Sequence, residues 1–401
     1  MTGFTSRAPL EAAIGWLDRQ LSPLPSERVP ILELAGRVLA GDIASDFDVP
    51  GFPRAMMDGF ALTAADTLGA APYNRLPLQI TGEVLPGREF PTAVETGQAV
   101  KIMTGAPVPI GADAVLPAEK VEVEEDRLYA MGEVAPGKHV GRAGEDVAVG
   151  SVVLPKGRHL RPQDVGVLSS IGVAEAEVVR RPRVRILVTG NELLPPGSKP
   201  SGCRIVDANS PMLAALVRRD GGVPINPGIV QDDPEAILHA MRDSADVVLV
   251  SGGSSVGQED YAPRLLAEHG ELAIHGVAMR PSSPAGMGKL DDRLVFLLPG
   301  NPVSCLCAYD FFGGRAIRVL AGLSANWPYR QLQARLRRKL VSAVGRVDYA
   351  RIKLVAGEVE PLAISGASIL SSTTRADGFV IVPGDSEGYP SDAEVTVWLY
   401  D

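Results

Sequence analysis

The sequence predicts a multidomain protein with a central doubly wound α/β domain and two β-rich regions. Strand-like and helix-like segments alternate about four times between Val184 and Gly322, which is the pattern of a parallel sheet covered by helices. Short β-like runs broken by glycine and proline occupy the stretches from Phe47 to Lys138 and from Leu332 to Val397. A chain of 401 residues has enough material for roughly two to four such domains.

Changes in this pattern of helix-like and strand-like segments along the chain predict four domains. They are a discontinuous helical and extended linker domain (1–50 and 139–180), a β-rich insertion domain (51–138), the α/β domain (181–325) and a C-terminal small β-barrel (326–401). Apolar residues at helical spacing predict two helices in the first linker segment, at about 9–20 and 31–39. A short helix is expected around 162–171 in the second.

Helix starts in the α/β domain are marked by a capping residue followed by proline. Ser210, Asp233 and Asn301 each stand directly before a proline, so each is expected at an N-cap position with the proline at the first helical position. Strands are expected at 184–188, 246–250 and 294–298. Because Asp233 is expected to cap the helix, its neighbour Asp232 is the better candidate for a role in the functional site.

Composition limits the class of partner. The formal net charge is −9 and the isoelectric point is near 5.2, so nucleic acid is not expected as a partner and an anionic ligand must be bound by local positive charge. No apolar stretch approaches the ~20 residues of a membrane span, and the N-terminus has no signal-like apolar run. A cytoplasmic protein without a membrane partner is expected. The three cysteines have no metal-ligand spacing, and Cys305 and Cys307 are interpreted as packing residues.

Two strand ends run into loops of small residues and predict an anion-binding rim. Leu249–Gly257 reads Leu-Val-Ser-Gly-Gly-Ser-Ser-Val-Gly, and 294–298 runs into Pro-Gly-Asn-Pro-Val-Ser. Ligands of open α/β sheets lie beyond the carboxyl ends of the strands, where backbone N–H groups can meet phosphate.

Several blocks then carry a family resemblance. The chain contains Ala-Met-Met-Asp-Gly-Phe-Ala (55–61), Ile-Met-Thr-Gly-Ala-Pro-Val-Pro (102–109), Gly-Glu-Asp (144–146), Ser-Gly-Gly (251–253) and Leu-Pro-Gly-Asn-Pro-Val-Ser (298–304). In this order they resemble the molybdopterin molybdenumtransferases, the MoeA and gephyrin E-domain family. The resemblance covers essentially the whole chain.

The resemblance implies a reaction and an assembly. It implies hydrolysis of adenylated molybdopterin with Mg²⁺, followed by insertion of molybdate into the dithiolene, by an elongated homodimer of four-domain subunits. A molybdopterin adenylyltransferase and a recipient molybdoenzyme are the expected partners. Cleaving a phosphoanhydride requires a hard cation held by oxygen ligands and a positioned water.

The resemblance also implies the site residues. The expected catalytic residues are Asp58, Thr104, Glu192 and Asp260, and the carboxylates among them, Asp58, Glu192 and Asp260, are the expected metal ligands. Cofactor binding is expected at Gly252, Gly253, Ser254, Gly257, Asp232, Pro299, Gly300 and Asn301. Oxyanion binding is expected at Arg280, Ser283, Ser304 and Arg351. From the residues alone, Asp58 and Thr104 also suit turns, and Asp260 also suits a helix cap.

Departures from the family pattern leave the activity open. The family's Lys-Pro-Gly-Lys-Pro is here Arg-Pro-Ser-Ser-Pro (280–284), and Asn191 replaces an aspartate. The loss of one lysine predicts weaker dianion binding, by ~1–3 kcal/mol. Three alternatives to a molybdate-inserting enzyme follow: a tungstate-inserting variant, a non-catalytic carrier of the cofactor, or an unrelated phosphate-ester enzyme on the same scaffold.

Overall fold

The computed structural model describes residues 7–252, 261–363 and 366–400. The chain divides into two compact units, each described by itself below. One comprises Met1–Arg28, Gly36–Val38 and Glu177–Asp401, and the other comprises Val29–Ala35 and Leu39–Ala176. We call them the sheet unit and the insertion unit. Among the described residues, the structure holds no helix with the length and apolar character needed to cross a membrane.

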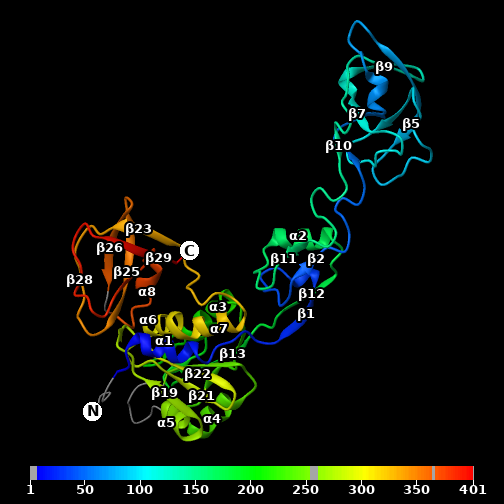
Figure 1. Cartoon of the computed structure of the whole chain (residues 1–401). Coiled ribbons are helices and arrows are strands. Elements are labelled where there is room, and N and C mark those ends of the chain that lie inside the picture. The colour runs from blue at the N-terminus through cyan, green and yellow to red at the C-terminus, as the bar shows by residue number, and fades with distance from the viewer. Residues whose placement is uncertain (1–6, 253–260, 364–365, 401) are drawn as a thin grey trace. The chain divides into compact units, whose positions relative to one another are not determined.

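A seven-stranded sheet forms the centre of the sheet unit (Figure 1). Its strands are, in spatial order, β16 (Val223–Ile225), β13 (Arg183–Thr189) with β17 (Ile229–Val230) beside it, β18 (Val247–Ser251), β22 (Arg293–Leu298), β21 (Gly286–Leu290) and β19 (Glu271–His275). The strands from β16 to β22 are parallel, whereas β21 and β19 are antiparallel additions. The predicted parallel sheet is therefore confirmed, with a mixed edge.

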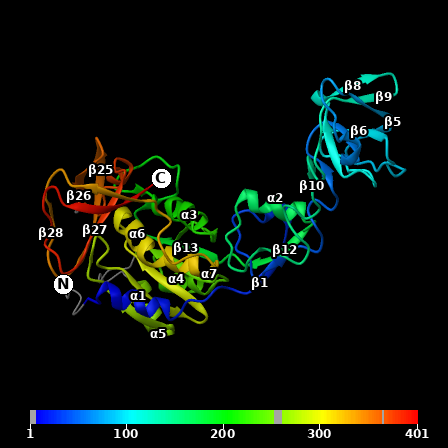
Figure 2. The same cartoon turned by 45° about the horizontal axis from the view of Figure 1, so that its top comes forward.

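Alternate residues of the central strands face two different helical layers. Ile186 and Leu249 pack in one core cluster, whereas Leu187 and Val250 pack in another. The helices on the first side are α1 (Leu10–Asp18), α3 (Asn209–Arg219), α6 (Pro302–Ala308) and α7 (Gly314–Leu320), the last two joined by the π-helical turn η4 (Tyr309–Gly313). On the second side are α4 (Pro234–Arg242) and α5 (Tyr261–His269) (Figure 2). This is the predicted doubly wound arrangement. Cys305 and Cys307 are buried in the first cluster, as expected.

The C-terminal region closes into a small barrel. Its sheet contains β20 (Met279–Arg280), β25 (Val347–Val355) with β26 (Glu358–Ala363) beside it, β27 (Gly378–Val382), β29 (Glu394–Leu399) and β23 (Gln331–Arg335). A bridge between Leu336, at the end of β23, and Val359 in β26 completes the ring. The remaining elements are β24 (Leu340–Val341) paired with β28 (Gly388–Tyr389), and the short helix α8 (Ser371–Thr374). The strand β20 belongs to this sheet although it lies in the α/β part of the sequence.

The insertion unit is built on a six-stranded sheet. In spatial order the strands are β7 (Ala114–Pro117), β4 (Gly59–Leu62), β6 (Gln98–Ile102), β5 (Leu76–Val84), β9 (Arg127–Ala130) and β8 (Val121–Glu124). Two small sheets pair β3 (Arg54–Ala55) with β10 (Val140–Gly141) and β2 (Ile43–Ala44) with β11 (Val152–Leu154). The helix α2 (Pro162–Ser170) lies where the sequence predicts it. The insertion unit also contains the 3-10 turns η1 (Ile31–Glu33), η2 (Ala64–Thr67) and η3 (Ala118–Lys120). Elsewhere in the chain β1 (Ser26–Pro30) pairs with β12 (Glu175–Val179), and in the sheet unit β14 (Leu193–Leu194) pairs with β15 (Ile205–Val206).

Two local predictions are wrong. The segment 31–39 forms only the turn η1 rather than a helix, because Gly36 adopts a φ of +76°, which a right-handed helix cannot contain. The helix α3 begins at Asn209, one residue before the predicted cap Ser210. The carboxylate of Asp207 accepts the backbone N–H groups of Asn209 at 2.9 Å and of Ser210 at 3.0 Å, so an upstream aspartate accepts hydrogen bonds from the backbone N–H groups of the first helical turn.

Candidate active site

Two adjoining cavities lie in the sheet unit, and Asn301 lines both. The first, which we call the strand-end cavity, has a volume of about 450 Å³ and is lined by Glu192, Gly252 and Gly300. These residues follow β13, β18 and β22. The three parallel strands thus deliver the predicted loop residues to one edge of the sheet, as the topology requires.

The strand-end cavity depends on close backbone packing. Gly252 has a φ of +99°, and a Cβ there would overlap the carbonyl oxygen of Thr189, so only glycine fits. The amide nitrogen of Asn209 donates to the hydroxyl of Ser251 at 2.9 Å and to the carbonyl of Gly300 at 2.7 Å. Asn209 therefore ties the ends of β18 and β22 together. Asn209 and Asp207 also line the cavity, although no sequence motif marked either of them as a site residue.

Glu192 presents its side chain at the surface of the strand-end cavity. Within the described parts of the chain, no hydrogen bond or ion pair holds its carboxylate. Asp207, in contrast, uses its oxygens to bind the first turn of α3, including the hydroxyl of Ser210. Glu192 is therefore the carboxylate of this cavity that can bind a ligand directly.

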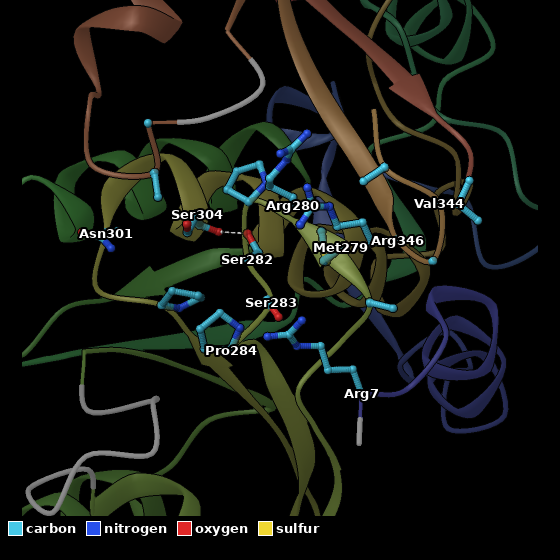
Figure 3. A pocket seen from close by; sticks show the side chains of 17 residues that line it. Arg7, Met279, Arg280, Ser282, Ser283, Pro284, Asn301, Ser304, Val344 and Arg346 are labelled. Carbon is cyan, nitrogen blue, oxygen red and sulfur yellow. Dashed lines mark hydrogen bonds between the residues drawn. The ribbon is translucent and has the colours of Figure 1, made fainter. Parts of the chain in front are cut away.

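The second cavity, which we call the guanidinium cavity, has a volume of about 640 Å³ and contains three arginines, Arg7, Arg280 and Arg346 (Figure 3). Ser283 and Ser304 also line it. Three of the four predicted oxyanion residues thus share one cavity.

Arg280 does not face this cavity as an unpaired cation. The strand β20 pairs with β25 so that Arg280 lies opposite Asp348, and its Nε donates to a carboxylate oxygen of Asp348 at 3.1 Å. Asp348 is fully buried, and it also contacts Nε of Arg346 at 3.3 Å and accepts the hydroxyl of Ser342 at 2.6 Å. One buried carboxylate therefore balances part of the charge of two arginines.

The serine loop after Arg280 has a constrained backbone. Ser282 adopts a φ of +90°, and its hydroxyl donates to the carbonyl of Ser304. The hydroxyl oxygen of Ser283 is buried and makes no hydrogen bond within the described residues. Because a buried hydroxyl normally has a partner, Ser283 is suited to bind a ligand in the cavity.

Arg351 occupies a different place from the other predicted oxyanion residues. It is fully buried and lines a separate cavity together with Lys353, Arg375 and Asp377. Burial lowers its pKa from the ordinary value. Arg351 lies three residues after Asp348 on β25, and an odd separation along a strand puts side chains on opposite faces.

The remaining predicted residues of the sheet unit are placed as follows. Asp233 caps α4 by accepting the N–H of Ala236 at 2.9 Å, as predicted. Asp232 is half-buried and does not line either named cavity among the described residues. Pro299 lines the guanidinium cavity. Four predicted site residues lie outside the described residues: Gly253, Ser254, Gly257 and Asp260.

Asp58 and Thr104 are brought together in the insertion unit. Gly59 pairs with Ile102 across β4 and β6, which places the residues that flank these strands side by side. A carboxylate oxygen of Asp58 accepts the backbone N–H of Thr104 at 2.8 Å and its hydroxyl at 2.7 Å. These two hydrogen bonds lower the pKa of Asp58, so the exposed carboxylate is ionised at neutral pH.

Comparisons with known proteins agree with this architecture. Residues 8–172 match the MoeA N-terminal region (domain I and II), 185–318 match a probable molybdopterin binding domain, and 333–400 match the MoeA C-terminal region (domain IV). Molybdopterin molybdenumtransferase 2 of Mycobacterium tuberculosis is 34% identical over 383 residues, covering 92% of this chain and 94% of the relative. This chain belongs to the MoeA family.

Other relatives extend the match. The molybdopterin molybdenumtransferase of Staphylococcus aureus (strain MRSA252) is 30% identical over 402 residues, covering 98% of this chain and 95% of that protein. A crystal structure of the molybdopterin biosynthesis moeA protein from Pyrococcus horikoshii OT3 superposes with a TM-score of 0.82 at 35% identity, covering 98% of this chain and all of that one. The resemblance and the fold class predicted from the sequence are therefore confirmed.

Proposed function

We propose that this MoeA-family chain is a molybdopterin molybdenumtransferase that hydrolyses adenylated molybdopterin and inserts molybdate into the dithiolene. The observation that carries the proposal is the shared wall at Asn301, which joins a cavity with an available carboxylate to a cavity rich in guanidinium groups. Such a pair of cavities suits a reaction with two anionic substrates. The pterin phosphates would occupy one cavity and the tetrahedral oxyanion the other.

We infer that the strand-end cavity would hold Mg²⁺ when the nucleotide is bound, with Glu192 as its carboxylate ligand. Mg²⁺ commonly takes one or two carboxylates and completes its shell with substrate phosphates and water. Glu192 would supply one carboxylate, and the described residues contain no preformed cluster of three or more metal-ligating side chains. The ion would neutralise charge on the phosphates during hydrolysis. The backbone of Gly252 and Gly300 would allow the substrate to approach the strand ends closely.

Release of AMP tests this assignment directly. Purified protein is incubated with adenylated molybdopterin and Mg²⁺, with and without molybdate, and both AMP and the pterin product are separated by chromatography. We expect the unaltered chain to release AMP only when molybdate is present. The rate of AMP release should fall at least roughly tenfold in the Glu192→Gln variant, because one metal ligand is lost. Glu235→Gln, an exposed carboxylate on α4, is the matched control.

Tight pterin binding without AMP release in the unaltered chain would contradict the proposal and identify a cofactor carrier. The replacement of the family's aspartate by Asn191 and the altered 280–284 segment would then explain the lost chemistry. Insertion of tungstate in preference to molybdate, measured in the same assay, would identify the metal variant. A chain that binds no molybdopterin would point to another phosphate ester.

We also propose that the active form is a homodimer in which Asp58 and Thr104 of one subunit complete the site of the other. The support is that these ionised and hydrogen-bonded groups lie in the insertion unit, while Glu192 lies in the sheet unit. Subunit complementation tests it. Asp58→Asn and Glu192→Gln are each expected to lose at least roughly tenfold in AMP release, and after subunit exchange about one quarter of the sites should regain both native residues. No recovery in verified mixed dimers would contradict a shared site.

The cellular setting proposed here follows from the same chemistry. The substrate is an adenylated pterin, so an adenylyltransferase acting on molybdopterin must precede this enzyme, and a molybdoenzyme must receive its product. Both are proposed as transient partners in the cytoplasm. Co-purification of either protein with the chain, and fractionation of cells, test these assignments.

A further inference from the structure

We propose that Arg7, in the segment before the first helix, supplies the uncompensated positive charge that binds the tetrahedral oxyanion in the guanidinium cavity. This inference rests on the proposed function and assigns a ligand-binding role to a residue far in sequence from every predicted site residue.

The charges of the cavity leave Arg7 without a carboxylate partner. Of the three arginines, Arg280 and Arg346 both contact the buried carboxylate of Asp348. Arg7 lines the same cavity, and no ion pair joins it to a carboxylate within the described residues. Among the described residues, three guanidinium groups and no carboxylate line this cavity, and Asp348 behind two of them is their contacting carboxylate, so the wall carries a positive charge that suits an anion.

The backbone around Arg7 is fixed to the sheet unit. Ala8 forms a parallel bridge with Val277, its N–H donates to the carbonyl of Gly276 at 2.9 Å, and its carbonyl accepts the N–H of Ala278 at 2.9 Å. The helix α1 follows directly and buries apolar residues in the main core. Because the chain on this side of Arg7 is already ordered, binding an anion would require little additional ordering of the backbone.

The side chain of Arg7 is directed toward the serine loop. In Figure 3 its guanidinium points to the part of the cavity lined by Ser283. The buried hydroxyl of Ser283 makes no hydrogen bond within the described chain. A tetrahedral oxyanion accepts hydrogen bonds from both a guanidinium and a hydroxyl, and the bonds from the charged donor are the stronger ones. The two groups therefore form a matched donor pair for such an anion.

A neighbouring cavity offers Arg7 a different role, in which it pairs with a carboxylate instead of binding the anion. Arg7 and Arg346 also line a cavity of about 630 Å³ that contains Glu11 and Asp385. Two carboxylates offset the two arginines on that side, so an anion is favoured on the Ser283 side. If Arg7 instead pairs with Glu11 or Asp385 in solution, its removal will not affect the anion.

Binding of molybdate alone to the full chain, measured by equilibrium dialysis or calorimetry, tests the inference. Removing one charge-assisted hydrogen bond predicts that Arg7→Ala weakens binding by at least about tenfold. Arg7→Lys should retain most of the affinity, because it keeps the charge. Arg335→Ala, which removes an exposed arginine from β23, should bind like the unaltered chain. Thermal unfolding of each variant checks that the fold is intact.

The outcomes separate this inference from the proposed function. Equal molybdate affinity in Arg7→Ala and the unaltered chain would overturn the role of Arg7 while leaving the cavity assignment in place. Equal weakening in Arg7→Ala and Arg335→Ala would overturn it as well, because the effect would be one of general charge. If the unaltered chain releases AMP but binds no molybdate, the oxyanion assignment of the cavity fails together with this inference, and the hydrolysis stands.

Discussion

Replacing Asp348 by asparagine should destabilise the sheet unit and at the same time tighten oxyanion binding. Asp348 is fully buried and is shared by Arg280, Arg346 and Ser342. Asparagine has nearly the same shape but carries no charge. The substitution therefore removes a negative charge from beside the guanidinium cavity without opening a hole.

The burial and spacing of these groups set the expected changes in unfolding free energy and in oxyanion affinity. Breaking a buried pair costs about 3–5 kcal/mol, but the side chains of Arg280 and Arg346 are 30% and 34% exposed, so water replaces part of the lost interaction. We expect a decrease in the free energy of unfolding of about 2–3 kcal/mol. One additional positive charge ~6 Å from a dianion gains about 1.4 kcal/mol even at the dielectric constant of water, which is about tenfold in affinity.

Chemical denaturation and molybdate titration of the same preparation measure both effects. Asp392→Asn removes an exposed carboxylate from the C-terminal region, and asparagine tolerates the φ of +65° at that position. It is the matched control and should change neither quantity appreciably. Weaker molybdate binding by folded Asp348→Asn would refute the charge argument, because it would mean that Asp348 acts mainly by holding Arg280 in place.

Three further predictions concern other positions. Thr104→Val removes one of the two hydrogen bonds that lower the pKa of Asp58, so the acid limb of the pH profile for AMP release should move to higher pH; an unchanged limb would contradict this role. Gly252→Ala forces a Cβ against the carbonyl of Thr189 and should cost about 2 kcal/mol or more of unfolding free energy, measured by denaturation. Burial raises the pKa of Asp310 from 3.8 to about 6. The protonated carboxyl therefore contributes its full stabilisation below about pH 4, and that contribution is lost as the pH rises through 6. In Asp310→Asn the free energy of unfolding, measured by denaturation at several pH values, should depend less on pH across this range.

Local sequence signals predicted much of the α/β part correctly. Asp233 followed by a proline gave the start of α4, and apolar runs gave β13, β18 and β22 within one or two residues. Because parallel strands share one carboxyl edge, these elements predicted that the loops at Gly252 and Gly300 form one rim. The family resemblance assigned Glu192 to the site, and the structure places it at the same edge. The structure brings Asp58 into hydrogen-bond contact with Thr104 in the insertion unit, and their role in the site stays a prediction.

Other features depend on contacts that no local pattern contains. The register of β20 against β25 sets Arg280 opposite Asp348, so a predicted oxyanion ligand has a buried counter-charge. The alternation of faces along β25 directs Arg351 away from Asp348. Arg346 lies only two residues from Asp348 in the sequence, but the burial of that acid comes from the folded structure, so no local signal pointed to Arg346.

The sequence by itself determined the order of the elements, the strand-end loops and the family, because hydrophobic periodicity, capping residues and glycine positions act over a few residues. Only the tertiary structure decided which charges remain available to a ligand. Arg280 and Arg7 are equivalent cations in the sequence, yet one faces a buried carboxylate and the other does not pair with a carboxylate among the described residues. Electrostatic interactions depend on distance and burial in the folded chain, so the compensation of a charge is fixed by its neighbours in space.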